Sequence, residues 1–326
     1  MIRYTPVNVL VALVVATSFA FVEASELAQY PSKPIRIIVP TVPGAPPDVI
    51  ARLVGERLAD VFGRPLVIEN RPGAIGTIGL STVARATADG YTLGVLAMPY
   101  VVAPALLARV PYDTEKDLAP IILVNWNYTI LAVPATSPAR SVVDLIAMAK
   151  AKPGFLKFSS NGNGTPPHLA GELFRREAGI SILHIPYKGS VAGLNALLSG
   201  EVDMTFGTAA LVAPFVQSGK LRALATAAPQ RLAQTPDIPT LVELGYPALQ
   251  ISDWQGIVAP AATPKALIRR LHSEIARIVG APDFVQRLVS IGMAPAGAGP
   301  EAFSSHIHNE IARWTKLVRD AGITAD

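Results

Sequence analysis

Residues 35–48 decide the fold class: they read Ile35-Arg-Ile-Ile-Val-Pro40 and then Thr41-Val-Pro-Gly-Ala-Pro-Pro-Asp48. A short β-branched run that ends at a proline is typical of a buried strand. The segment after it is rich in proline and glycine and predicts a loop. Apolar residues then recur at helical spacing, at Val49, Ile50, Leu53, Val54, Leu58, Val61 and Phe62. Strand, loop and helix in this order are the repeating unit of an α/β fold.

The same alternation continues along the chain. Strands are predicted at Leu66–Glu69 and Tyr91–Ala97, with a helix at Thr77–Ala86 behind the loop Gly73–Gly76. Strands that alternate with helices imply a parallel sheet covered on both faces.

A second set begins after Pro134, where Ser141 and Asp144 form a capping box. Its predicted elements are strands at 156–159, 183–186, 203–206 and 221–226, and helices at 166–178, 190–198 and 209–217. A strand at 253–258 and helices at 265–279, 282–291 and 300–321 follow. We therefore expect two α/β lobes, the first made of residues 25–125 plus 250–326 and the second of residues 126–249, with the chain crossing near 126 and 250.

Composition limits the function. The chain has 326 residues, 16% of them charged, no Cys and a formal net charge of +4. Two domains are the usual number at this length. The absence of Cys excludes disulfide scaffolds and thiol nucleophiles. Lys and Arg are scattered rather than gathered in a stripe, so we expect no nucleic-acid partner.

The N-terminus has the pattern of a secretory signal peptide at residues 1–24. Arg3 precedes an apolar run from Val7 to Val22, and Val22-Glu23-Ala24 places small residues where a signal peptidase cleaves. The alternative is a membrane anchor, but a spanning helix needs about 20 apolar residues. We expect cleavage after Ala24 and export of the mature protein.

Three loops lie where parallel sheets bind ligands, after a strand and before a helix. They are Thr41–Asp48, Ser159–Thr165 and Pro186–Ser190. Glycines and small polar residues with unpaired N–H groups at a helix start suit an anion such as a carboxylate. Gly and Asn are also ordinary turn residues, and Thr165 and Ser190 ordinary N-caps, so each loop alone has a structural explanation too.

The candidate ligand-binding residues belong to two expected walls of a shared crevice. The first wall takes Thr41, Pro43, Gly44, Ala45, Asp48, Gly76 and Thr77. The second takes Ser159, Ser160, Asn161, Asn163, Gly164, Thr165, His168, Tyr187, Lys188 and Gly189. Asp203 and Trp254 complete the set.

Several of these side chains have a second explanation. Asp48 near a helix start often serves the helix itself. Lys188 either pairs with a carboxylate or is solvated, and Tyr187 and Trp254 either line the crevice or fill a core. No nucleophile elbow, phosphate-binding loop or zinc-protease motif is present, and we predict no catalytic residue, cofactor or metal.

A run of motifs in order resembles a known family. The motifs are Pro43-Gly44 with Asp48, Glu69–Ala74, Ala88–Leu93, Pro111–Asp113, Ser159–Thr165 with His168, Pro186–Gly189, Pro239-Thr240 and Trp254. Together they resemble the substrate-binding receptors of tripartite tricarboxylate transporters, also called the Bug family. The resemblance implies a two-lobed periplasmic-binding-protein fold, type II-like, with a parallel-rich sheet flanked by helices in each lobe and a hinge between them. It also implies a small carboxylate ligand and a membrane permease as partner.

The first loop departs from the family pattern of Pro-Gly-Gly followed by a small hydroxyl residue. Ala45 resists the positive φ open to Gly, and Pro46 and Pro47 remove two N–H donors. Pro166 and Pro167 remove donors at a second helix start. These changes predict a less polar, or aromatic, carboxylate ligand.

We therefore interpret the chain as a monomeric periplasmic receptor that captures a small carboxylate between two lobes and delivers it to a permease. One alternative is a receptor that presents its ligand to a membrane sensor. A less favoured alternative is an exported α/β hydrolase, whose Ser, His and Asp would be recognised only by geometry.

Overall fold

The computed structural model describes residues 29–232 and 235–323. The predicted signal peptide, residues 1–24, lies outside them. In the part of the chain that the structure describes, no helix combines the length and apolar composition needed to cross a membrane.

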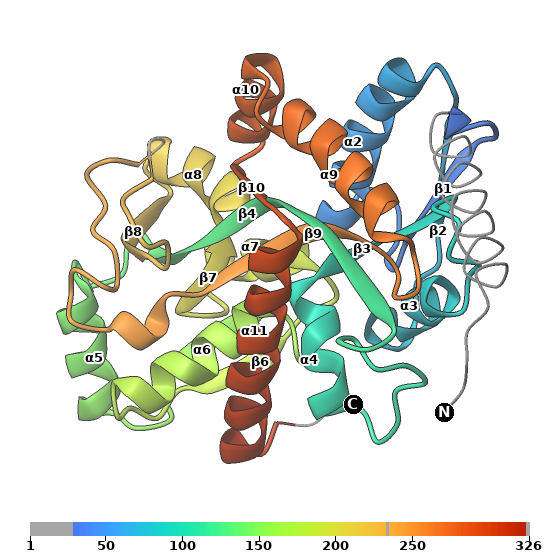
Figure 1. Cartoon of the computed structure of the whole chain (residues 1–326). Coiled ribbons are helices and arrows are strands. Elements are labelled where there is room, and N and C mark those ends of the chain that lie inside the picture. Colours follow the sequence, from blue (N-terminus) through green and yellow to red (C-terminus); the bar gives the residue numbers. More distant parts are fainter. Residues whose placement is uncertain (1–28, 233–234, 324–326) are drawn as a thin grey trace, which may run out of the picture.

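The first lobe forms on the right of Figure 1. Its strands follow the order β2-β1-β3-β9-β4, with β10 also paired to β4. The strands are β1 (Ile35–Val39), β2 (Leu66–Asn70), β3 (Thr92–Ala97), the first part of β4 (Leu118–Pro134), β9 (Ser252–Pro260) and β10 (Ala294–Ala298). The helices are α2 (Pro46–Phe62), η1 (Ala74–Gly76), α3 (Thr77–Ala84), α4 (Met98–Leu106), α9 (Lys265–Val279), α10 (Pro282–Ser290) and α11 (Pro300–Ala321).

The second lobe lies on the left of Figure 1. Its strands follow the order β4-β7-β5-β6, with β8 also paired to β4. The strands are the end of β4, β5 (Lys157–Ser160), β6 (Leu183–Pro186), β7 (Met204–Thr208) and β8 (Leu221–Thr226). The helices are α5 (Val142–Ala151), α6 (Pro166–Glu177), α7 (Ser190–Ser199), α8 (Ala209–Gln217) and η2 (Pro247–Leu249).

Strand β4 belongs to both lobes. Its residues as far as Tyr128 pair with β9, and from Thr129 onwards they pair with β7 and β8. The chain returns at Ile251, whose N–H still donates to Ala227 in the second lobe, whereas Ser252 already pairs in the first. The two crossings therefore lie side by side, and the lobe division near 126 and 250 stays our prediction for the hinge.

The two-lobed α/β fold that we predicted is confirmed, and its sheet is mixed. β1 runs parallel to β2 and β3, and β5 runs parallel to β6 and β7. β9 is antiparallel to β3 and β4, and β4 is antiparallel to β7 and β8. The antiparallel pairs are the strands at the crossings, which the sequence did not resolve.

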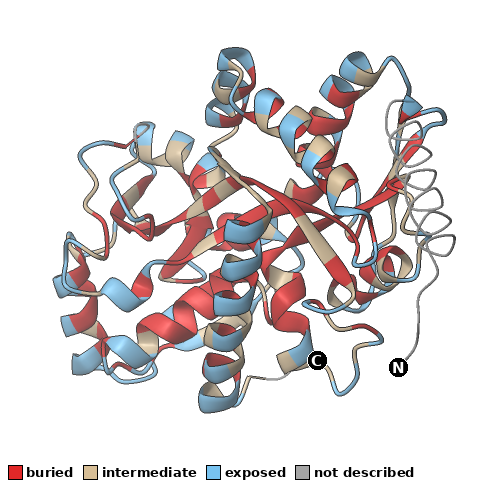
Figure 2. Cartoon of the chain, in the orientation of Figure 1, coloured by how far each residue is buried: buried red, intermediate tan, exposed pale blue. Residues whose placement is uncertain are grey.

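Apolar helix faces cover both sides of the sheet, and Figure 2 shows its central strands largely buried between them. In α9, apolar positions recur at helical spacing and form one buried stripe with α2 and α10. On the opposite face, buried side chains form one continuous core from α3 and α4 through α11 to α5 and α6. Helix α11 therefore packs against both lobes.

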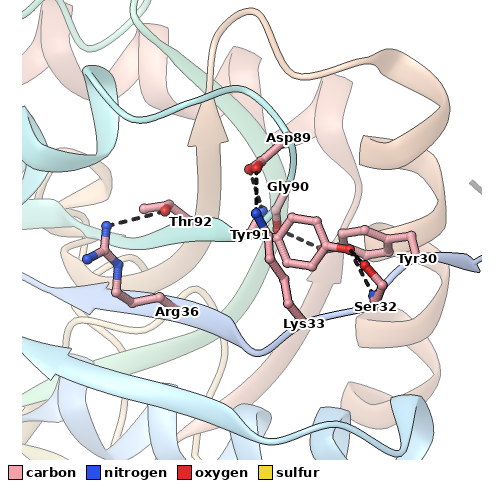
Figure 3. A network of polar contacts seen from close by, with 8 residues as sticks. All are labelled: Tyr30, Ser32, Lys33, Arg36, Asp89, Gly90, Tyr91 and Thr92. Atoms are coloured by element: carbon pink, nitrogen blue, oxygen red, sulfur yellow. Dashed lines mark hydrogen bonds and ion pairs between the residues drawn. The ribbon is translucent and has the colours of Figure 1, made fainter. Parts of the chain in front are cut away.

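The first described residues are fixed to the loop before β3 (Figure 3). The Tyr30 hydroxyl donates to the carbonyl of Gly90 at 2.7 Å, and the N–H of Ser32 donates to the hydroxyl of Tyr91 at 2.8 Å. The Lys33 ammonium lies 4.3 Å from the centre of the Tyr91 ring. These contacts hold the chain in place as it enters β1.

Candidate functional site

The loop after β1 is shaped by a buried carboxylate, Asp48, which is 2% exposed. Its Oδ2 accepts from the N–H of Gly44 and from Nε of Arg52, each at 2.9 Å. Its Oδ1 accepts from Arg52 Nη2 at 3.0 Å and from Asn70 Nδ2 at 2.8 Å. Asn70 also donates to the carbonyl of Thr41 at 3.0 Å, so the loop is tied to the end of β2. Asp48 therefore organises its own loop and helix.

The pKa of Asp48 follows from these contacts. Burial alone would raise it, but the hydrogen bonds from Arg52, Gly44 and Asn70 outweigh burial and hold the pKa of the carboxyl below its ordinary value. Asp48 is thus a charged, fully engaged side chain at neutral pH. Gly44 takes the positive φ of the loop, +84°, and Ala45 is extended at φ −72° and ψ 158°.

The second loop of the first lobe, residues 73–77, has an unusual backbone. Ala74 and Ile75 both have positive φ, 45° and 51°, and Gly76 follows at +79°. A non-glycine residue in this region costs about 1–2 kcal/mol. A Cβ on Gly76 would lie 2.4 Å from the Tyr100 ring, so the backbone approaches that ring closely. Strain of this size, held by packing, is common at ligand-binding loops.

Tyr100, near the start of α4, connects the first-lobe loops. Its ring packs on Gly76, and its hydroxyl has a hydrogen bond with the Thr41 side chain. Burial, and then the charge of Asp253, raise the pKa of Tyr100 above its ordinary value, so the hydroxyl is neutral. The sequence analysis missed Tyr100 because no local motif marks it.

In the second lobe, β5 ends with two buried serines, just before its loop. Ser159 Oγ donates to Thr205 Oγ1 at 3.0 Å across β5 and β7. Ser160 Oγ lies 2.6 Å from His184 Nε2 and also accepts from the N–H of Gly162 at 3.1 Å. A hydroxyl beside an imidazole is the start of a hydrolytic dyad, but Ser160 is only 2% exposed. Its Oγ is enclosed by the turn that follows, where it also lies 3.1 Å from the carbonyl of Gly162.

His168 is a structural histidine. Its ring stacks on His184 at 3.9 Å between ring centres, and its Nδ1 accepts from the N–H of Gly164 at 3.0 Å. Burial, and then the neighbouring His184, lower the pKa of His168 to about 3. His168 is therefore neutral at physiological pH and fixes the Gly164 turn.

The glycine N–H groups that the sequence predicted to be available to an anion are instead engaged inside their loops. Gly44 donates to Asp48, Gly76 to the carbonyl of Gly73, Gly164 to His168 and Gly189 to the carbonyl of Tyr187. This prediction was wrong because the loops are tightly turned and satisfy their own donors.

Side chains from three strand ends do come together in one small pocket. Ser159, Asn161, Ser190 and Thr208 line it, where α7 and α8 begin. Its volume of about 10 Å³ has room for about one water molecule. Thr208, the N-cap position of α8, was not among the predicted residues. Thr205, which accepts the hydrogen bond from Ser159, was also missed. Both threonines belong to strand β7.

Four other candidates have different surroundings. The Tyr187 hydroxyl donates to Glu201 at 2.8 Å on the surface, and burial and Glu201 raise its pKa to about 12. Lys188 is exposed. Asp203 accepts from the N–H of Lys157 at 2.7 Å, at the amino end of β5 and so at the opposite end from Ser160. Trp254 is fully buried in the core. We therefore remove Asp203 and Trp254 from the binding set.

The remaining candidates keep their predicted loops. Pro43 is exposed, Thr165 Oγ1 donates to the carbonyl of Gly162 at 2.6 Å, and Thr77 Oγ1 donates to the carbonyl of Ala74 at 2.9 Å. Within residues 29–232 and 235–323, no three His, Cys, Asp or Glu side chains gather as they would to hold a metal ion.

The two lobes meet at α4. Tyr100, at one end of the helix, contacts Gly76, and Leu106, at the other end, lies against Gly164 of the second lobe, whose Cβ would meet it at 2.4 Å. The loops at 73–77 and 159–165 thus border the same helix from opposite lobes.

Comparison with known proteins identifies the family. Residues 50–323 match the model of the tripartite tricarboxylate transporter family receptor. This chain belongs to that receptor family. It is 37% identical over 295 residues to Protein BugT of Bordetella pertussis, covering 90% of each chain. The chain is thus a solute-binding receptor, as the motifs predicted.

Solved structures agree with this assignment. Rpa4515 of R. palustris, solved with adipate, is 33% identical and has a TM-score of 0.79. The match covers 91% of this receptor and 100% of that chain. MatC (Rpa3494) of Rhodopseudomonas palustris, solved with malate, is 29% identical with a TM-score of 0.75, over 89% of this receptor and 100% of that chain.

Proposed function

We propose that this receptor works in the periplasm, captures a small carboxylate between its lobes and delivers it to a membrane permease of the tripartite tricarboxylate type. The observation that carries the proposal is the meeting of Ser159, Asn161, Ser190 and Thr208 at the starts of α7 and α8. Hydroxyl and amide groups beside two helix N-termini favour a negative charge. Adipate and malate in two related structures support the same ligand class.

We further propose that the ligand is less polar than is usual in the family, and aromatic acids are the main candidates. Pro46 and Pro47 open α2, and Pro166 and Pro167 open α6, so four N–H donors are missing from the first turns of two helices that border the site. The engaged glycine N–H groups reduce the donor count further. An apolar ligand body needs fewer donors.

A binding panel tests both statements. We expect benzoate or phenylacetate to bind more tightly than malate or citrate in isothermal titration calorimetry of the protein purified without its signal peptide. Preference for citrate or malate contradicts the less polar ligand. Absence of binding by every acid, adipate included, contradicts carboxylate capture.

Two variants test the loop. Asn163→Ala should weaken binding of the best acid at least several-fold, whereas Asn195→Ala, on the exposed face of α7, should leave affinity unchanged. Equal affinities would show that the loop at 159–165 does not hold the ligand. Gly164→Val is a poor test, because Gly164 has φ +71° and its Cβ would meet Leu106. The change would disturb the fold.

Delivery to a permease and presentation to a sensor differ in the membrane partner. Capture of membrane proteins by the receptor, with and without the best acid, distinguishes them by mass spectrometry. The predicted cleavage after Ala24 is checked by the N-terminal mass of protein from a periplasmic extract, and the predicted monomer by light scattering.

A further inference from the structure

Asp253 is a buried carboxyl at the crossing between the lobes. It is the second residue of β9, lies opposite Asn127 of β4 and is 8% exposed. Two residues further along β9, Gln255 pairs with Ala97, the last residue of β3. Asp253 therefore lies just beyond the carboxyl end of β3, at the sheet edge from which the loop at 41–48 also emerges after β1.

Tyr100 links the surroundings of Asp253 to the first-lobe loops. Tyr100 senses the charge of Asp253, packs on Gly76 and has a hydrogen bond with Thr41. On the other side, the β4 strand carries Asn127 opposite Asp253, and two residues further Thr129 pairs with Thr208 at the pocket of the second lobe. Asp253 is thus placed between the two proposed walls of the crevice.

The hydrogen bonds of Asp253 leave its charge without a cation. Oδ1 accepts from the N–H of Trp254 and Oδ2 accepts from Gln255 Nε2, both at 2.9 Å. None of the ion pairs among the described residues includes Asp253. The titratable groups that act on or sense it are Glu310 from α11, which is acidic, and Tyr100 from α4, which is neutral; β4 presents the uncharged Asn127.

A chain of buried amides can serve either protonation state. Asn125 Nδ2 donates to Gln255 Oε1 at 2.7 Å, and Gln255 in turn donates to Asp253. Asn125 Oδ1 is buried and has no partner. If Asp253 is protonated and donates to Gln255, both amides can rotate by half a turn, and the unpartnered oxygen of Asn125 then accepts from Gln255. Neither direction leaves the carboxyl unsatisfied.

The electrostatics agree with this geometry. Burial raises the pKa of Asp253 to about 7, the charge of Glu310 adds to the rise, and the hydrogen bonds from Trp254 and Gln255 oppose it. A second negative charge brought into the crevice disfavours the ionised carboxyl further. A ligand that binds the neutral form better must, by linkage, raise proton affinity by the same factor.

We propose that Asp253 takes up one proton from solvent when the receptor captures its carboxylate, so that ligand binding is proton-linked. The carboxylate of Asp253, a proton and the ligand anion give a complex of neutral Asp253 and bound anion. No other bond forms or breaks. The inference rests on the proposed capture of a carboxylate. Protonation of Asp253 removes a negative charge that would otherwise repel the ligand anion.

The first experiment uses the ligand-free receptor. Carboxyl ¹³C chemical shifts of Asp side chains are followed by NMR between pH 4 and pH 9, and Asp253→Asn assigns the resonance of Asp253. We expect this resonance to titrate near pH 7. Titration in the ordinary range, below pH 5, overturns the proposal whether or not a ligand is known.

The second experiment measures binding of adipate and benzoate by calorimetry at pH 6, 7 and 8. If only the protonated form binds and its free pKa is about 7, the association constant falls about tenfold from pH 6 to pH 8. Ordinary carboxyl groups do not titrate in this window. Measurements in buffers of different ionisation enthalpy count the protons taken up, about one per ligand at pH 8.

Two variants assign the effect. Asp253→Asn should bind with no pH dependence and no proton uptake, and Asp203→Asn, which removes a carboxylate distant from the crevice, should behave like the native receptor. Binding of the native protein that is independent of pH, or an unchanged slope in Asp253→Asn, overturns the inference and leaves carboxylate capture intact. No binding of either acid at any pH overturns carboxylate capture itself.

Discussion

Asp48→Asn tests whether the first loop is held by an internal carboxylate or uses it to contact ligand. An asparagine at this position has one oxygen and one amino group, and each of the two native oxygens faces two donors. Whichever way the amide turns, two donors meet its amino group. Asp48→Asn therefore loses two charge-assisted hydrogen bonds and places donors against donors.

The magnitude follows from these contacts. A hydrogen bond to a charged group contributes about 1.5–3 kcal/mol. Arg52 has a side chain that is 53% exposed, and water replaces part of its loss. We therefore expect Asp48→Asn to lower the free energy of unfolding by about 3 kcal/mol at pH 7, a fall in Tm of roughly 5–10 °C.

The loss of stability in Asp48→Asn should depend on pH. Because the pKa of Asp48 is lowered in the folded protein, the stabilisation is fully present above the unfolded pKa of about 3.9 and is lost as pH falls through the folded pKa. The difference in Tm between the variant and the native protein should therefore shrink below pH 4, as followed by circular dichroism.

Asp144→Asn is the matched control. Asp144 also accepts a backbone N–H, that of Arg140 at 3.0 Å, but at the exposed start of α5, and among the described residues no guanidinium donates a hydrogen bond to it. Its Tm should fall less. If Asp48→Asn keeps the native Tm and yet loses ligand affinity, or loses no more stability than the control, the carboxylate acts on the ligand and our assignment is refuted.

Three further substitutions probe the site and the core. Gly76→Ala should cost clearly more stability than Gly44→Ala in urea unfolding, because both have positive φ but only Gly76 places the new Cβ 2.4 Å from the Tyr100 ring; equal costs would contradict the close approach. Asp253→Asn should stabilise the receptor at pH 8 by up to about 4 kcal/mol and much less at pH 5. Since its folded pKa is raised to about 7, the native protein loses stability as pH rises from about 4 to about 7, and a benefit that does not vary with pH would argue against the raised pKa. Glu310→Leu should cost about 3 kcal/mol in thermal unfolding, because one buried carboxylate oxygen accepts from two indole N–H groups at 3.1 and 2.8 Å, and Glu310→Gln, which keeps an acceptor, should cost about a third as much; similar costs for both would mean that these bonds contribute little.

Elements bounded by proline or glycine, or with a regular apolar period, were predicted well. The helices α8, α9 and α11 and the strands β6 and β8 have the predicted bounds. Their limits are set by proline and glycine and by a regular apolar period, which are local properties.

Elements without such signals were missed. Strand β4 runs through Asn125, Trp126 and Asn127, polar and bulky residues that interrupt its apolar pattern. The strand partner of Asn125 is Gln255, which lies 130 positions further along the chain. Helix α4 contains Pro104 and is apolar all round, so its period is hidden. Both elements are stabilised by tertiary packing, which overrides local preference.

The residues around the candidate site were also predictable only in part. Sequence placed the loops correctly, since each follows a strand and precedes a helix. It could not say where their N–H groups would donate, because the acceptors are other parts of the folded loop, such as His168 for Gly164. Donor availability depends on the completed turn.

Two buried aspartates show where sequence reasoning ends. Asp48 has Arg52 four residues later on the same helix, a spacing that itself predicts an ion pair, and its pKa is lowered. Asp253 has no cation at helical or strand spacing, and its surroundings come from α4, β4 and α11, so only the fold shows that its pKa is raised. The first carboxylate therefore shapes a loop at every physiological pH. The second has a pKa raised to about 7 and lies on β9, which pairs with the strand shared by the two lobes, so under our proposal its proton state affects the binding of an anion between them.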